Sequence, residues 1–247
     1  MSPRPRVRES LYSLAQVCRI FSDPALDLLW ARQNTLGNIL LCMPMDLWQV
    51  TGAGRRRFFR ARRAIEPQDW VRFHVYAPRI RFLSLSNFRF DVAEDTWSPV
   101  FEMLSAAIDT PHIFPNLRMI WWSVTDPWFS YVHLFLCPTI KSLVLRGLKT
   151  PAHLALLPTL PQRCPLVTSI TLRMAPQLQV SCHPRSLMVC GMMFLEKLDI
   201  GSIDQNAFEH LSRLATLKTL IIDSPPTLFH PMLLPMLVDS QTYASSP

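Results

Sequence analysis

The side chains that could act as nucleophiles, acids or metal ligands are scattered along the chain. Cys182, His183 and Cys190 form the one close group of cysteine and histidine, whereas zinc usually takes four ligands at tighter, paired spacings. The acidic residues between 91 and 95 fall in a polar stretch that is typical of a solvated loop. No nucleophile elbow, HExxH motif or glycine-rich dinucleotide turn is present. The sequence therefore predicts a binding protein that is not an enzyme and needs no metal or cofactor.

Positive charge is concentrated in the first quarter of the chain. Residues 1–63 hold 11 Lys and Arg against 4 Asp and Glu, which accounts for the whole formal charge of +7. The densest part is "RRRFFRARR" at 55–63, which could be a nuclear-import signal or an anion contact, although a solvated loop is the simpler interpretation. A nucleic-acid reader more often carries its basic residues over its main binding surface, so the distribution argues against nucleic acid as the partner.

Cysteine usage and hydropathy indicate the compartment. None of the six cysteines forms a C-x-x-C pair, which predicts free thiols in a reducing environment. Arg19 interrupts the first apolar stretch, so no secretory signal peptide is predicted. The longest apolar run, at 187–195, is far shorter than the roughly 20 residues that span a bilayer. We therefore expect a cytoplasmic or nuclear protein with no membrane contact.

The elements that would position a binding surface form an uneven repeat. Six stretches share an apolar residue, two variable ones, an apolar, a variable and an apolar, and their starts are 22 to 37 residues apart. In four of them a proline stands two residues before the first apolar position. Short alternating stretches predict half-buried strands, and strand–helix units of about 20–29 residues are typical of leucine-rich repeats. The stretches are 79–85, 116–122, 139–145, 166–172, 194–200 and 216–222.

Helical segments fit between several of these strands. Residues 96–109 and 204–214 each place their apolar residues on one face, behind Thr96 and Asp204 as possible caps. The predicted fold is α/β, with a short N-terminal helical segment followed by an irregular leucine-rich-repeat solenoid. Its strands should lie parallel, in chain order, in one curved sheet. The alternative is an ordinary α/β sheet, because the Asn or Cys that normally follows a leucine-rich strand is not regular here.

The start of the chain predicts a compact helical hairpin. Apolar side chains in residues 11–18 recur at the i, i+3, i+4, i+7 spacing of a helix. Ser22 or Asp23 could cap a second helix, with Pro24 near its first position. A third short helix could begin at Thr35.

This start resembles part of a known family. "SLAQVCRIFSDPALDLLW" at 13–30 resembles the second half of an F-box, and later stretches such as "IFPNLRMIWW" at 113–122 and "CPLVTSITL" at 164–172 resemble the large fungal F-box families in the same order. The likeness covers roughly residues 8–222. F-box proteins are substrate receptors of cullin–RING ubiquitin ligases, in which the F-box binds a Skp-type adaptor and the repeats hold the target. The resemblance implies that this chain recruits an unknown protein target for ubiquitination.

The resemblance also implies a division of the chain and a set of adaptor contacts. A partial F-box would occupy 8–48, a basic linker and connecting helix 49–75, the repeats 76–235 and a tail 236–247. No counterpart of the family's first helix precedes Leu11, so we expect weak adaptor binding. The alternative is a repeat scaffold that no longer binds the adaptor. The positions implied for adaptor binding are Leu14, Val17, Cys18, Phe21, Leu29 and Trp30.

The strand pattern predicts where a target would bind. The two later apolar positions of each strand point into the core, so their neighbours should face the inner wall of the sheet. Trp121 is the predicted anchor, unless the N-terminal helices or a loop between repeats cover it. The predicted target contacts are Phe82, Met119, Trp121, Val144, Arg146 and Arg173, and the inner wall also takes in Ser84, Ser142, Thr171, Lys197, Asp199 and Ile221.

Overall fold

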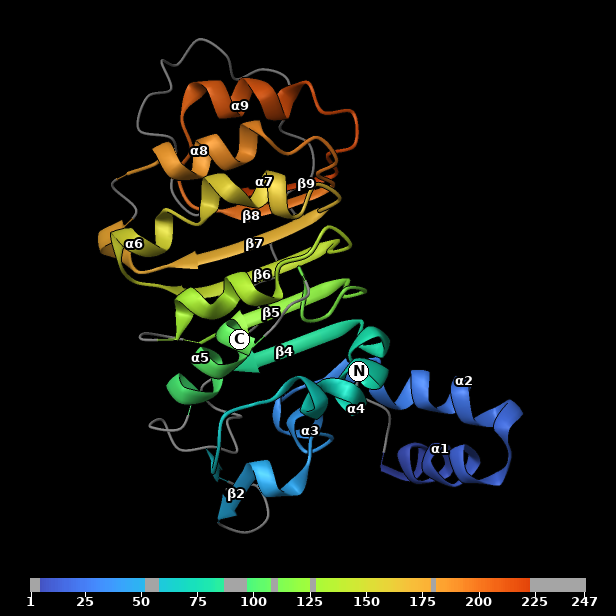
Figure 1. The fold of residues 1–247 in the computed structure, drawn as a ribbon. Coiled ribbons are helices and arrows are strands. Elements are labelled where there is room, and N and C mark those ends of the chain that lie inside the picture. The colour runs from blue at the N-terminus through green and yellow to red at the C-terminus, as the bar shows by residue number, and fades with distance from the viewer. Residues whose placement is uncertain are drawn as a thin grey trace, which may run out of the picture.

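The chain forms an α/β fold around a parallel sheet, as the sequence predicts. The computed structural model describes residues 5–51, 58–86, 97–107, 111–124, 128–178 and 181–222. Seven strands form the sheet in the order β1-β4-β5-β6-β7-β8-β9 (Figure 1). They are β1 (Arg32–Gln33), β4 (Phe82–Ser86), β5 (Met119–Ser123), β6 (Ser142–Leu148), β7 (Ser169–Met174), β8 (Lys197–Ile200) and β9 (Thr219–Ile222).

The six predicted strands are neighbours in chain order. Each of β4 to β8 pairs in parallel with the next strand, which confirms that part of the prediction. Equivalent positions face one another, so that Leu83, Ile120, Leu143 and Ile170 stand in register across four strands. The sequence did not predict β1, which pairs with β4 and forms the edge of the sheet.

The prolines before the strands belong to a repeated turn. The backbone N–H groups of Ile80, Leu117, Ile140 and Val167 each donate to the carbonyl three residues earlier, at 3.1–3.3 Å. Proline occupies the second position of all four turns, where its fixed φ is favoured and its missing N–H costs nothing. The side chains of these four residues are fully buried, so each turn fixes the point at which a strand enters the core.

The strands enter the sheet through a second repeated contact. The N–H groups of Arg118 and Met119 both donate to the carbonyl of Arg81, at 2.8 and 3.1 Å. Because each unit offers one carbonyl to two successive donors of the next, the units stack with the same offset despite their unequal lengths. The same pair of bonds recurs at the carbonyls of Ala31, Arg118, Lys141, Thr168 and Glu196.

The helical connections cover one face of the sheet (Figure 1). The helices predicted at 96–109 and 204–214 are confirmed, and the Asp204 side chain caps the second by accepting from the Ala207 N–H at 2.9 Å. Thr96 and Ile108 lie outside the described residues. The connecting helices are α5 (Trp97–Ala107), η6 (Phe129–Phe135), α6 (Pro151–Leu154), η7 (Leu157–Thr159), α7 (Leu160–Arg163), η8 (Pro176–Leu178), α8 (His183–Cys190) and α9 (Gln205–Ser212).

Between the helices and the sheet lies one apolar core. It runs without interruption from Leu36 to Leu211. Near β5 it is largely aromatic: the ring centroids of Trp122 and Phe135 are 5.5 Å apart, and those of Phe114 and Phe135 are 5.7 Å apart. These large rings fill the space under a long connection that small side chains would leave empty.

The N-terminal hairpin is present, but its second helix begins earlier than predicted. It consists of α1 (Pro5–Val17) and α2 (Arg19–Trp30). Cys18, not Ser22 or Asp23, precedes α2, in extended backbone, and the Ser22 N–H already donates to the Cys18 carbonyl at 3.0 Å. Pro24 therefore lies inside the helix, where an exposed position tolerates the missing hydrogen bond.

The segment between hairpin and sheet is more regular than predicted. The prediction of a solvated loop at 55–63 is wrong for residues 58–61, because they pair with residues 48–51 as an antiparallel hairpin. Nor is Arg63 free, because it binds Asp46 at 2.9 Å and the buried Asp69 at 2.6 Å. The elements are α3 (Gly37–Leu40), η1 (Met45–Leu47), β2 (Trp48–Thr51), β3 (Phe58–Ala61), η2 (Pro67–Asp69), α4 (Trp70–Tyr76) and η3 (Ala77–Arg79).

Candidate functional site

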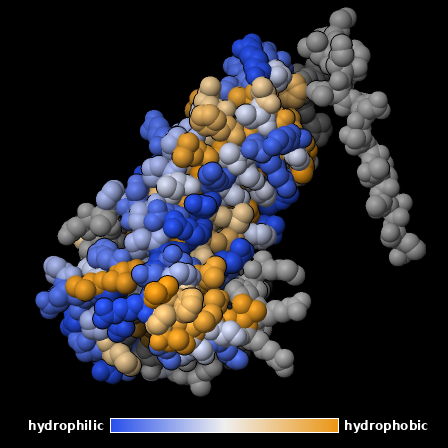
Figure 2. Space-filling model, turned by 90° about the vertical axis from the view of Figure 1, so that its right-hand side faces the viewer, coloured by the Kyte–Doolittle hydropathy of each residue, from blue (hydrophilic) through white to orange (hydrophobic). Residues whose placement is uncertain are grey.

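The α1–α2 hairpin carries an exposed apolar surface. It projects from the side of the molecule at which the strands begin (Figure 1), and Figure 2 shows hydrophobic side chains gathered over it. Ala25 is its one buried residue among those whose side chains the structure describes. An apolar cluster of this kind on a projecting element marks an interaction site. Its large exposed apolar side chains are Val7, Tyr12, Leu14, Val17, Ile20, Phe21 and Leu28.

The structure divides the six residues that the F-box resemblance selects. Leu14, Val17, Cys18 and Phe21 are exposed and lie within one helical turn of the corner between the two helices. By contrast, Leu29 and Trp30 are half-buried at the base of the hairpin. The Trp30 ring stacks on Tyr76 with 4.6 Å between ring centroids. The first four are therefore available to a partner, while Trp30 helps to attach the hairpin.

Arg79 forms the second attachment of the hairpin, which sequence reasoning missed. Its guanidinium binds Asp23 at 2.7 Å and also binds Asp27, one helical turn further along α2. Burial works against this cation, but the two carboxylates hold the pKa of Arg79 above its ordinary value. The i, i+4 spacing of the two aspartates was the available signal, since it places both on one face of a helix.

A groove separates the hairpin from the rest of the chain. Its volume is about 690 Å³, and its lining is mainly apolar, with Tyr12, Leu29, Trp30, Leu41 and Tyr76 among its residues. The hairpin is thus held at its base and leaves much of its inner side accessible.

The second candidate surface is the face of the seven-stranded sheet opposite the helices, called here the open face. Residues along each strand alternate between buried and partly exposed, so the predicted target contacts lie on this face. Trp121 is 36% exposed, whereas the adjacent Trp122 is fully buried. Phe82, Met119 and Val144 are half-buried, and Arg146 is exposed.

Two arginines stack on aromatic rings of the open face. The guanidinium carbon of Arg146 lies 4.8 Å from the centre of the Trp121 ring, and that of Arg32 lies 4.2 Å from the centre of Phe82. Such contacts hold both the cation and the ring in place. Arg32 was missed by sequence reasoning because its position depends on the pairing of β1 with β4.

Arg173 and Asp199 form an ion pair with one another. Their two side chains form paired hydrogen bonds at 2.6 and 2.7 Å, and Asp199 is only 7% exposed. Asp199 lies on the predicted inner wall, in register with Thr171, but Arg173 covers it and leaves it little exposed. Arg173 remains half-buried on the open face with its charge compensated.

Residues suited to chemistry are not assembled into a centre. Among the described residues, no three His, Cys, Asp or Glu side chains lie close enough to hold a metal ion. A cavity of about 610 Å³ on the helical side includes His133 and His153. His153 is buried against Phe129, 4.3 Å between ring centroids, and its Nδ1 accepts the Lys149 N–H. These contacts give His153 a structural role in the turn that follows β6.

Two further findings bear on what the chain is. Within the described ranges, no helix combines the length and apolar character needed to cross a bilayer. Comparisons with protein family models, with curated proteins and with solved structures found no match. Any functional assignment therefore depends on the two surfaces and on the sequence patterns that form them.

Proposed function

We propose that this chain is an F-box-type substrate receptor of a cullin–RING ubiquitin ligase. In this proposal the tip of the α1–α2 hairpin binds a Skp-type adaptor, and the open face holds an unknown protein target. The observation that carries it is the exposed apolar tip, in which Phe21 is 52% and Val17 is 70% exposed at positions that the F-box resemblance selects. The chain itself performs no bond chemistry.

Two features support a repeat architecture for the target-binding part. The proline turn and the shared carbonyl recur from unit to unit, which is expected of leucine-rich repeats with irregular lengths. The repeats present one continuous face, while the hairpin projects from their edge, so an adaptor and a target could bind together. The six cysteines are all free, which agrees with action in the cytoplasm or nucleus.

The adaptor interaction can be tested with the purified chain and a purified Skp-type adaptor. We expect weak binding by the chain as it stands, and at least tenfold tighter binding when a complete F-box first helix is joined before Pro5, where α1 begins. In that extended chain Phe21→Asp should abolish binding, because it places a charge in the apolar contact. Met193→Asp is the matched control, since Met193 is 60% exposed on the body of the protein. Isothermal titration calorimetry gives the affinities.

Two outcomes would contradict the proposal. One is an extended chain that does not bind the adaptor, which would favour a scaffold that has lost this partner. The other is equal weakening by Phe21→Asp and Met193→Asp, which would place the contact away from the hairpin tip.

A further inference from the structure

The open face is strongly cationic although residues 64–247 are neutral overall. Four basic residues lie on the face, and four more lie at the strand-entry rim, defined as the residues immediately before strands β4 to β9. Glu196 and Asp199 are the carboxylates of these two regions. The basic residues of the face are Arg32, Arg146, Arg173 and Lys197, and those of the rim are Arg81, Arg118, Lys141 and Lys218.

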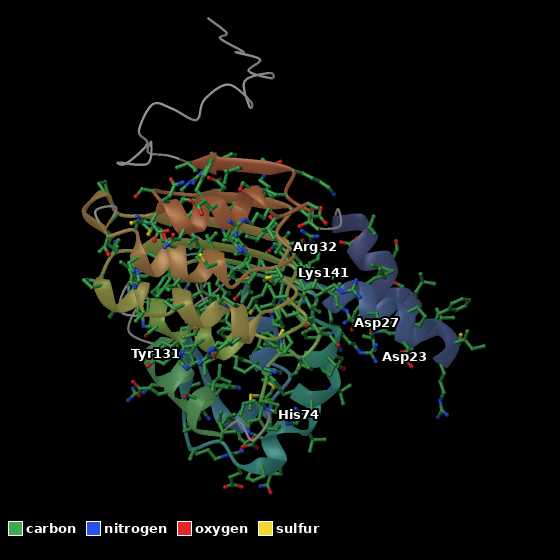
Figure 3. The ribbon with its side chains drawn as sticks, turned by 90° about the horizontal axis from the view of Figure 1, so that it is seen from above. Asp23, Asp27, Arg32, His74, Tyr131 and Lys141 are labelled. Atoms are coloured by element: carbon green, nitrogen blue, oxygen red, sulfur yellow. The ribbon has the colours of Figure 1, made fainter. Side chains whose placement is uncertain are left out.

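Each of these two carboxylates already forms an ion pair with a basic side chain. Glu196 binds Lys218 at 2.7 Å, and Asp199 binds Arg173. Arg32, Lys141 and Arg146 have no carboxylate within ion-pair distance in the part of the chain that the structure describes. Figure 3 shows Arg32 and Lys141 on the side from which the hairpin projects. Asp23 and Asp27, which bind Arg79, lie on helix α2 of that hairpin.

The stacked arginines indicate the chemistry of the missing partner. A guanidinium that lies on a ring keeps its N–H groups at its edge, in the fork that matches a carboxylate. The same stacking covers a face of Phe82 and of Trp121. Single-stranded nucleic acids bind largely by stacking bases on open aromatic faces, so this arrangement favours carboxylates over bases.

The spacing of the two arginines sets the length of the partner. Arg32 and Arg146 are three strand steps apart across the sheet, about 14 Å, and four residues apart along it, about 13 Å. Their guanidinium groups, however, lie over Phe82 and Trp121, which are one strand step and two residues apart, so the ring positions are separated by about 8 Å, which an extended chain spans in about two to three residues.

We propose that the open face binds an extended acidic peptide segment, whose carboxylates reach Arg32 and Arg146 about two to three residues apart. This inference rests on the proposed function, in which the open face is the target surface. Met119 and Val144 lie between the two arginines and contact the apolar part of the segment, and the rim cations steer it toward the face.

The experiment uses two labelled peptides of about twelve residues, one with two Glu pairs about three residues apart and one with Gln in their place. Fluorescence anisotropy should show the Glu peptide binding at least tenfold more tightly, with an affinity that falls as salt rises. The double variant Arg32→Glu with Arg146→Glu should lose this preference. Arg213→Glu changes the charge of a single side chain that is 79% exposed at the C-terminal end of α9, on the helical side, and should keep the preference.

Three results would overturn the proposal: equal binding of the two peptides, equal loss in the Arg213→Glu control, or a single-stranded oligonucleotide that binds more tightly at the same two arginines. The peptide titrations are repeated on the extended chain, which carries the complete F-box first helix, and the adaptor is titrated into the same preparation. Normal adaptor binding without a peptide preference would reject the acidic segment alone, whereas peptide preference without adaptor binding would reject only the ligase role.

Discussion

Trp121 and Trp122 are neighbours in β5 that have opposite surroundings. Trp121 lies on the open face under Arg146, while Trp122 packs between Phe101 and Phe135 in the core. The Trp122 indole N–H is buried with no hydrogen-bond partner among the described residues, so the core contains an unsatisfied donor there. The period of two along a strand therefore places one tryptophan on the open face and the other in the core.

The two tryptophans should respond differently to truncation. Trp122→Ala should lower the free energy of unfolding by about 3–5 kcal/mol, because it empties a large core volume. Trp121→Ala should lower it by less than about 1 kcal/mol, as surface changes usually do, while abolishing capture of the acidic peptide. Urea unfolding gives the stabilities and anisotropy the binding. A large loss of stability in Trp121→Ala would make it a core residue and remove it from the binding surface.

The burial of polar residues is a feature that the sequence could not predict. Arg185 is fully buried in α8, where its guanidinium donates to the Ser202 carbonyl at 2.7 Å and to the Ser202 hydroxyl at 2.8 Å. Desolvation lowers the pKa of Arg185 below its ordinary value. Nothing in the sequence around Arg185 separates it from a solvated helical arginine, because its partners come from a loop after another strand.

At the scale of elements, local patterns were sufficient for the strands and two of the helices. Alternating apolar residues located β4 to β9, and capping and spacing located α5 and α9. The misses are elements whose existence depends on distant partners. β1 is two residues long and is defined by pairing with β4 about fifty positions later, and β3 lies in an arginine-rich run whose charge disguised it. The helical hairpin was predictable from the apolar spacing of residues 11–18, whereas its role in adaptor binding stays a prediction from the family resemblance.

The repeated turns bury two thiols, which gives them a measurable pH dependence. Cys137 and Cys164 each precede the proline of a turn and are fully buried. Burial, reinforced by the nearby Cys137 thiol, raises the pKa of Cys164 to about 12. The unfolded chain ionises this thiol near its ordinary pKa of about 8.5, so it loses the proton first as pH rises. Stability contributed by the neutral thiol is therefore complete below about pH 8.5 and is lost toward pH 12.

We expect the wild-type chain to lose up to about 1.4 kcal/mol per pH unit more than Cys164→Ala within this window. Denaturant unfolding of both proteins at matched pH isolates the thiol from the lysines and tyrosines that titrate there. In the native protein, a maleimide should modify the exposed Cys18 while sparing Cys164 until the chain unfolds. Parallel pH profiles for the two proteins would contradict the assigned shift.

For the whole molecule, the arrangement separates a body with one continuous core from a hairpin whose apolar side chains are largely exposed. One core unites Leu36 to Leu211, whereas α1 packs chiefly on α2 and exposes most of its apolar side chains. The junction is β1, since the Ala31 carbonyl accepts the first two N–H groups of the repeat stack and the buried Gln33 binds the Trp30 carbonyl and the Asn38 side chain. Residues 18–35 thus connect the exposed tip of the hairpin directly to the first strand.

Two truncations test this separation. Deleting residues 1–17 removes α1 alone, and should lower the melting temperature by no more than the roughly 2–4 °C that 1 kcal/mol produces in a domain of this size. Deleting residues 1–35 also removes β1, which leaves the N–H groups of Arg81 and Phe82 without their acceptor and uncovers the edge of β4. That loss should cost several kcal/mol or make the protein insoluble, because an exposed parallel edge is prone to pair with other chains. Thermal unfolding followed by circular dichroism distinguishes the two. Equal destabilisation by both deletions would mean that α1 belongs to the folded body, and that its exposed apolar residues are part of the fold and not a surface kept for a partner.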